Sequence, residues 1–158
     1  MSADSPEMAS TATTAERVYF AIYERMAAKS DYLQPDNYNQ MLPEAVIVAG
    51  VVSIITGILS GISEGFLGKV GEDIADQARK LLTKLKPKKD KPGQQKPDEL
   101  VAIIAGAVPM LQVSVTNWDE ISACIALELT RQGMRFPVSQ ELAREIAAGV
   151  KDALGAPR

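Results

Sequence analysis

The feature that most constrains this chain of 158 residues is an uncharged run from Ala45 to Ser63, which reads AVIVAGVVSIITGILSGIS. Its mean hydropathy is about 2.2, which lies in the range of membrane-spanning helices. As an α-helix the run would be about 28 Å long, close to the thickness of the hydrocarbon layer of a bilayer. We therefore expect either a helix that inserts in or spans a membrane, or the buried central helix of a soluble bundle.

Two features favour the membrane. The run is rich in Val and Ile, which a soluble helix uses less readily than Leu and Ala. Acidic residues outnumber basic ones before position 45, whereas Lys and Arg dominate residues 79–96. The positive-inside rule then predicts a membrane-associated protein with this basic segment in the cytoplasm. The run has no aromatic belt at either end and contains Gly50, Gly57 and Gly61, which favours the alternative of a soluble cytoplasmic protein.

Small residues recur at spacings of three and four along the run and beyond it. The predicted helix-association ridge consists of Gly50, Ser53, Gly57, Gly61, Gly65 and Gly68. Missing side chains let helix backbones approach closely, which is how apolar helices associate in lipid. The pattern predicts a homo-oligomer, with tight packing inside a soluble bundle as the alternative use of the same glycines.

A basic segment follows the apolar run. We expect it to contact the anionic headgroups of membrane lipids, at about 1 kcal/mol for each cation near the surface. The residues concerned are Arg79, Lys80, Lys84, Lys86, Lys88, Lys89 and Lys91. A solvated linker is the alternative interpretation. No nucleic-acid partner is expected, because the net charge is −3 and only 5% of the residues are aromatic.

The pattern of apolar residues and breakers predicts helices throughout. Thr13 and Glu16 form a capping box for a first helix, and a central helix of about 40 residues would end before Pro87. The predicted divisions are a disordered leader (1–13), a part with the N-terminal and central helices (14–86), a Lys/Pro linker (87–97) and a C-terminal helical module (98–158).

The C-terminal module is expected to contain three helices. Pro109 should stop or kink the first, leaving Met110–Val115 as a short strand or extended chain. Asn117 would cap the second helix, which ends at Gly133, and Ser139 would open the last. A second uncharged run at residues 100–118 leaves a second membrane span open as an alternative.

Composition excludes several kinds of chemistry. The chain has no histidine, so Ser-His-Asp and Cys-His catalytic sets and histidine-bearing zinc sites are excluded. Cys124 is the only cysteine, which excludes CxxC motifs, and its apolar surroundings predict a small buried side chain. We expect a protein that is not an enzyme and has no cofactor or metal.

Together these features predict an all-α protein, a small helical bundle with one long central helix whose N-terminal half is apolar and Gly-rich. The leading interpretation is a non-enzymatic protein that inserts in or spans a membrane and self-associates through the glycine ridge. It would act as a membrane-perturbing effector, for example a pore-forming one, or as a membrane-anchored adaptor. The alternative is a soluble protein-interaction module with residues 45–63 as its core helix and a protein partner at the C-terminal module. Exposure of Val48, Val52, Ile55 and Leu59 should distinguish the two.

Overall fold

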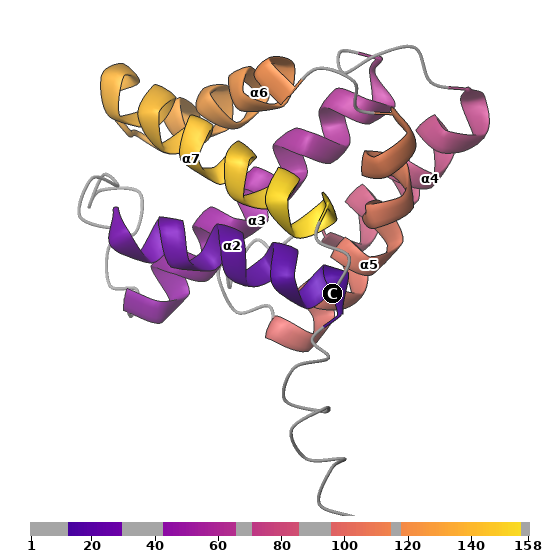
Figure 1. Cartoon of the computed structure of the whole chain (residues 1–158), viewed down its shortest axis with the longest axis horizontal. Coiled ribbons are helices and arrows are strands. Elements are labelled where there is room, and N and C mark those ends of the chain that lie inside the picture. The colour runs from indigo at the N-terminus through magenta and orange to yellow at the C-terminus, as the bar shows by residue number, and fades with distance from the viewer. Residues whose placement is uncertain (1–12, 30–42, 66–70, 86–95, 115–117, 156–158) are drawn as a thin grey trace, which may run out of the picture.

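The computed structural model describes residues 13–29, 43–65, 71–85, 96–114 and 118–155, and within these residues the secondary structure consists of helices joined by turns, with no strand. The all-α prediction is confirmed. The helices are α2 (Thr14–Ala28), α3 (Pro43–Ser63), α4 (Glu72–Leu85), α5 (Pro97–Ser114), α6 (Trp118–Arg131) and α7 (Phe136–Gly155) (Figure 1). They form one bundle in which α3 contacts α2, α4, α5 and α6, while α7 packs on α2 and α6.

The start of α2 is the capping box that the sequence predicts. The Glu16 amide donates to Thr13 Oγ1 at 3.1 Å, and the Thr13 amide donates to Glu16 Oε1 at 2.9 Å. Two amides that have no partner within the helix are thus satisfied. This part of the sequence prediction is confirmed.

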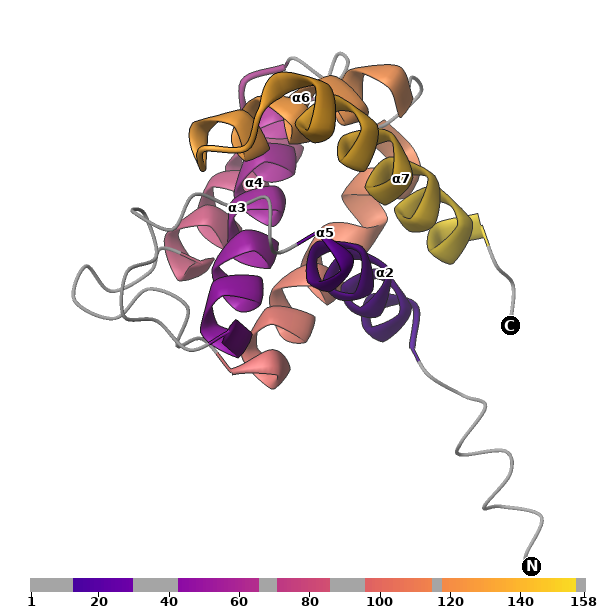
Figure 2. The same ribbon diagram turned by 90° about the vertical axis from the view of Figure 1, so that its left-hand side faces the viewer.

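The single central helix of about 40 residues expected from the sequence is two helices in the structure. Helix α3 ends at Ser63, and Gly65 has a φ of 80°, a backbone conformation that glycine adopts without steric cost. The Gly65 amide donates to the carbonyl oxygen of Ile62 at 3.2 Å and closes the last turn. Helix α4 then lies beside α3 rather than extending it (Figure 2).

Of the two outcomes expected for Pro109, a stop or a kink, the stop was wrong, because α5 continues to Ser114. Proline removes the amide that would bond to the carbonyl of Ala105, but both residues are exposed, so water can solvate this carbonyl. On the opposite side, Met110 and Leu111 are buried in the core. Burial of these two side chains offsets the lost hydrogen bond, and the expected extended segment is helical as far as residue 114.

The turn between α6 and α7 confirms the helix end predicted at Gly133. This residue has a φ of 99°, its amide donates to Thr130, and the Met134 amide donates to Leu129, both at 3.0 Å. These bonds form a Schellman motif. Helix α7, however, begins at Phe136 rather than at Ser139, which is fully buried. The predicted cap Asn117 lies outside the described residues.

Instead of capping α7, the Ser139 hydroxyl links it to α6. Ser139 Oγ donates to the carbonyl oxygen of Phe136 at 2.9 Å and lies 3.0 Å from Thr130 Oγ1. The Thr130 hydroxyl is itself 2.8 Å from the carbonyl oxygen of Ala126. A buried hydroxyl costs little when it is hydrogen-bonded in this way, so this short network fixes how the two helices pack.

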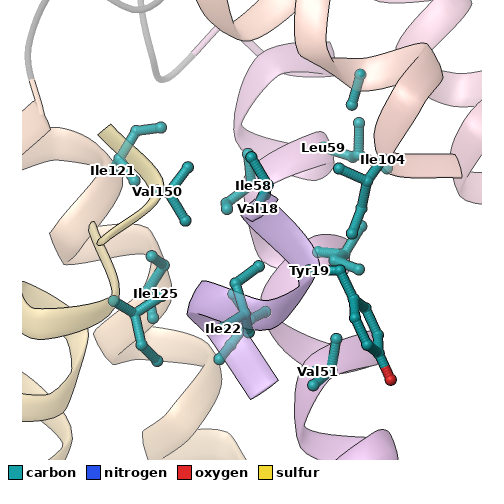
Figure 3. Packing of buried hydrophobic residues seen from close by; sticks show 14 of the residues in the cluster. Val18, Tyr19, Ile22, Val51, Ile58, Leu59, Ile104, Ile121, Ile125 and Val150 are labelled. Carbon is teal, nitrogen blue, oxygen red and sulfur yellow. The ribbon is translucent and has the colours of Figure 1, made fainter. Parts of the chain in front are cut away.

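All six described helices contribute to one hydrophobic core. Figure 3 shows side chains from α2, α3, α5, α6 and α7 meeting there, with Ile22 of α2 among residues of its neighbours. The helices of the predicted C-terminal module therefore share a core with α2, α3 and α4. Residues 1–12 and 86–95, which include most of the predicted leader and linker, lie outside the described part.

Candidate functional site

Helix α3 combines a membrane-like composition with burial. An 18-residue stretch within Glu44–Ser63 has a mean hydropathy of 2.4, and in the described part of the chain only this helix is long and apolar enough to cross a membrane. In the bundle, 61% of that apolar stretch is buried. Length and composition alone do not separate a membrane span from a core helix, because both need the same residues.

The four residues whose exposure should distinguish a membrane helix from a core helix are all buried. Val48, Val52, Ile55 and Leu59 are 8%, 5%, 4% and 0% exposed. They lie on one side of α3, and the side chains of neighbouring helices surround them. Their burial favours the soluble-bundle alternative over a helix that presents a continuous apolar band to lipid.

The face of α3 that remains half-buried is lined with small and hydroxyl-bearing side chains. It consists of Ala49, Ser53, Thr56, Ser60 and Ser63, at alternating spacings of four and three. Ser53 Oγ donates to the Ala49 carbonyl at 3.1 Å, and Thr56 Oγ1 to the Val52 carbonyl at 2.8 Å. We call these five residues the hydroxyl stripe. Because the hydroxyls of Ser53 and Thr56 bond to their own helix, they need no partner from another helix.

Two glycines of the predicted helix-association ridge lie where other helices of the same chain approach α3 closely. An added Cβ at Gly50 would overlap the terminal methyl group of Met26 in α2. An added Cβ at Gly57 would lie 2.5 Å from Glu128 Cγ in α6 and 3.5 Å from the Cys124 carbonyl oxygen. In the folded bundle, the ridge therefore faces α2 and α6 of the same chain at these two positions.

The other ridge residues are dispersed. Gly61 is buried, Ser53 belongs to the hydroxyl stripe, and Gly65 forms the turn after α3. Gly68 lies outside the described residues. The six positions therefore do not form one continuous surface in this structure, and self-association through the ridge stays a prediction.

Three of the predicted headgroup-contacting residues lie on the exposed side of α4. Arg79, Lys80 and Lys84 are solvent-exposed, and the Arg79 guanidinium forms an ion pair with Asp76 one turn earlier. The remaining four, Lys86, Lys88, Lys89 and Lys91, lie outside the described part. These three cations are available to solvent, although Glu72, Asp73 and Asp76 are exposed on the same helix, and contact with lipid stays a prediction.

A groove between α6 and α7 was missed in the sequence analysis. It has a volume of about 500 Å³ and is bordered by two of the most exposed large apolar side chains, Phe136 at 61% and Leu127 at 54%. Its remaining lining residues are Asp119, Ser122, Ala123, Ala126, Thr130, Gln140 and Arg144. The sequence pattern that could have indicated this groove is in α6. There, Ala123 and Leu127 make a second apolar row beside the buried row of Ile121 and Ile125.

The cysteine beside the groove is a poor nucleophile. Cys124 is half-buried nearby in α6, and burial raises the pKa of its thiol, with smaller contributions from Glu120 and Glu128. A raised pKa keeps the sulfur protonated near neutral pH and therefore poorly nucleophilic. Among the described residues, no group of three or more Cys, Asp or Glu side chains is arranged to hold a metal ion.

Within the described residues, the bundle thus has a buried apolar helix, α3, and an exposed groove between α6 and α7. In comparisons with protein-family models, curated proteins and solved structures, the chain has no match.

Proposed function

We propose that this chain is a non-enzymatic helical module that binds protein, with residues 45–63 as its buried core helix. The observation that carries the proposal is the burial of α3 by α2, α4, α5 and α6. A helix that is apolar on most of its circumference and covered by amphipathic neighbours is typical of the centre of a water-soluble bundle. Partners would then meet the outer helices.

The α6–α7 groove is the surface that this function would use. Phe136 and Leu127 expose large apolar side chains at its edges, whereas Ala123 and Ala126 leave space between them. Exposed apolar surface with a polar border is characteristic of protein-binding sites. The groove also lies in the C-terminal helices, where the sequence analysis placed a possible protein partner.

Fractionation tests the core of this proposal. The full chain is expressed, the cells are lysed without detergent, and the membrane pellet is washed with alkaline carbonate. We expect a monodisperse protein in the soluble fraction, because α3 is covered. A pellet that resists carbonate would contradict the proposal.

Insertion of α3 into a membrane after the bundle opens is a second candidate function, and the hydroxyl stripe favours it. A transmembrane helix must satisfy its polar groups internally, and Ser53, Thr56 and Ser63 already donate to carbonyl oxygens of their own helix. Exposed cations on α4 would add attraction to an anionic leaflet. In this interpretation the soluble bundle is the resting form.

A lysine at position 53 separates the two candidates. Ser53 lies on the half-buried stripe, so the cation can reach water in the bundle. Near the centre of a membrane span, the same cation costs about 3 kcal/mol. We expect Ser53→Lys to fold like the uncharged control Ser53→Ala. If the wild type permeabilises phosphatidylglycerol vesicles and only Ser53→Lys loses this activity, insertion is the function.

A further inference from the structure

Helix α6 carries a row of exposed residues whose order is self-complementary. Asp119, Ala123, Leu127 and Arg131 follow one another at spacings of four and are all exposed. Residues at this spacing form one ridge along a helix surface. The order along it is acidic, small, large and basic, and we call these four residues the α6 ridge.

Two copies of the α6 ridge match when they run antiparallel. With the pairing centred beside Ile125, Asp119 of each copy faces Arg131 of the other, and Leu127 of each faces the small Ala123. The positive end of each helix dipole also lies near the negative end of the other. Charge and side-chain volume thus select the same register.

The side chains at this surface allow the pairing. Arg131 Nη1 lies 2.9 Å from Glu128 Oε2, but the arginine side chain is 66% exposed and its other guanidinium hydrogens can reach a second carboxylate. Asp119, Ala123 and Leu127 of the ridge also line the α6–α7 groove, and Phe136 at the edge of the groove would extend the contact. A foreign helix would need the same charge order to match, which a second copy supplies by symmetry.

We propose that this chain forms a two-fold symmetric homodimer in which the α6 ridges of two copies pair antiparallel beside the α6–α7 grooves. The proposal rests on the proposed function and identifies its partner as a second copy of the chain. It also moves the site of self-association from the glycines of α3, which contact α2 and α6, to the outer face of α6.

Charge exchange tests the register. Asp119→Arg and Arg131→Asp each place like charges opposite each other twice in the dimer, and each should weaken dimerisation about tenfold in sedimentation equilibrium. An equimolar mixture of the two variants should restore the dimer as a heterodimer, because both cross pairs become opposite in sign. If the mixture remained monomeric although circular dichroism shows that each variant is folded, the proposed antiparallel register would be overturned.

The apolar centre has a matched control. Leu127→Glu should raise the dissociation constant at least about 30-fold. Phe20→Glu introduces the same charge at an apolar side chain of α2 that is 52% exposed, and should leave the dissociation constant unchanged. The dimer would be overturned if both variants raised the dissociation constant equally. It would also be overturned if the wild-type chain were monomeric across the concentration series.

A photo-crosslinking amino acid at position 127 of the full chain, in cells that express it, separates this proposal from the proposed function. An adduct of twice the chain mass, absent when the probe is at position 20, supports the homodimer. An adduct with another protein overturns the homodimer and leaves the protein-binding function in place. If neither adduct forms at position 127, both are overturned.

Discussion

Truncation of Leu59 to alanine tests the burial of α3 most quantitatively. Leu59 is fully buried and borders a small apolar cavity of about 20 Å³, together with Ile58, Ile104 and other core residues. The three lost carbons correspond to about 2.4 kcal/mol of transfer free energy. The new void joins the existing cavity, and each Å³ of residual cavity adds about 24 cal/mol.

We therefore expect Leu59→Ala to lower the free energy of unfolding by about 4 kcal/mol, in the upper part of the range for buried leucines. For a chain of this size, that loss lowers the Tm by about 8–16 °C. Urea denaturation followed by circular dichroism, with a common m value, measures it. Leu127→Ala makes the same chemical change at an exposed site and should cost under about 1 kcal/mol.

A loss below about 1 kcal/mol for Leu59→Ala would refute the reasoning, because it would mean that Leu59 has no packed surroundings to lose. Equal losses for the two leucines would refute it in the same way. Filling the cavity provides the converse experiment. Ala107 borders it, and Ala107→Val should preserve or raise stability if the void is where the structure places it.

Gly57→Leu should lower the free energy of unfolding by more than about 2 kcal/mol, measured in urea, because the new side chain enters space occupied by Glu128. Hydrogen bonds with the backbone and side chain of Thr13 lower the pKa of the Glu16 carboxyl group. The ionised carboxylate therefore stabilises the folded chain at pH values above its unfolded-state pKa, and this contribution is lost as the pH falls through the folded-state pKa. Thr13→Ala keeps the backbone hydrogen bond and removes the side-chain one, so it should reduce in part the loss of stability at acid pH, measured by pH-dependent melting. Burial raises the Cys124 pKa, so its reaction with a thiol reagent should be slow at neutral pH and should accelerate on unfolding in guanidinium.

Each of these predictions has a control. Gly71→Ala adds a methyl group where no atom lies within 4 Å, and should not lower stability. Acid sensitivity that is unchanged in Thr13→Ala would contradict the role of the capping box. Equal reaction rates for folded and unfolded Cys124 would show that burial does not protect the thiol.

Local sequence patterns predicted two of the helix ends correctly, although Ser139 does not open α7 as expected. The capping box of Thr13 and Glu16 and the C-terminal glycine at Gly133 depend on neighbouring residues alone, and the structure confirms both. Such signals transfer directly from sequence to structure because the backbone groups they satisfy are close in the chain.

Features that depend on packing could not be predicted in the same way. Pro109 stays inside α5 because Met110 and Leu111 are buried by other helices, which local propensity does not report. Gly65 fits both a helix ridge and a left-handed turn, and the choice depends on α4 packing against α3. The groove needed α7 as its second wall, so the row of Ala123 and Leu127 alone did not reveal it.

The central claim, that α3 is the core helix of a bundle stable in water, is tested most directly by two adjacent lysine substitutions. Ser53 lies on the half-buried hydroxyl stripe, whereas its neighbour Ile54 is fully buried. Urea denaturation of the detergent-free protein should place Ser53→Lys within about 1 kcal/mol of the wild type. Ile54→Lys should lose at least about 4 kcal/mol or fail to fold, because it buries an unpaired charge. Equal effects at the two positions would contradict the account.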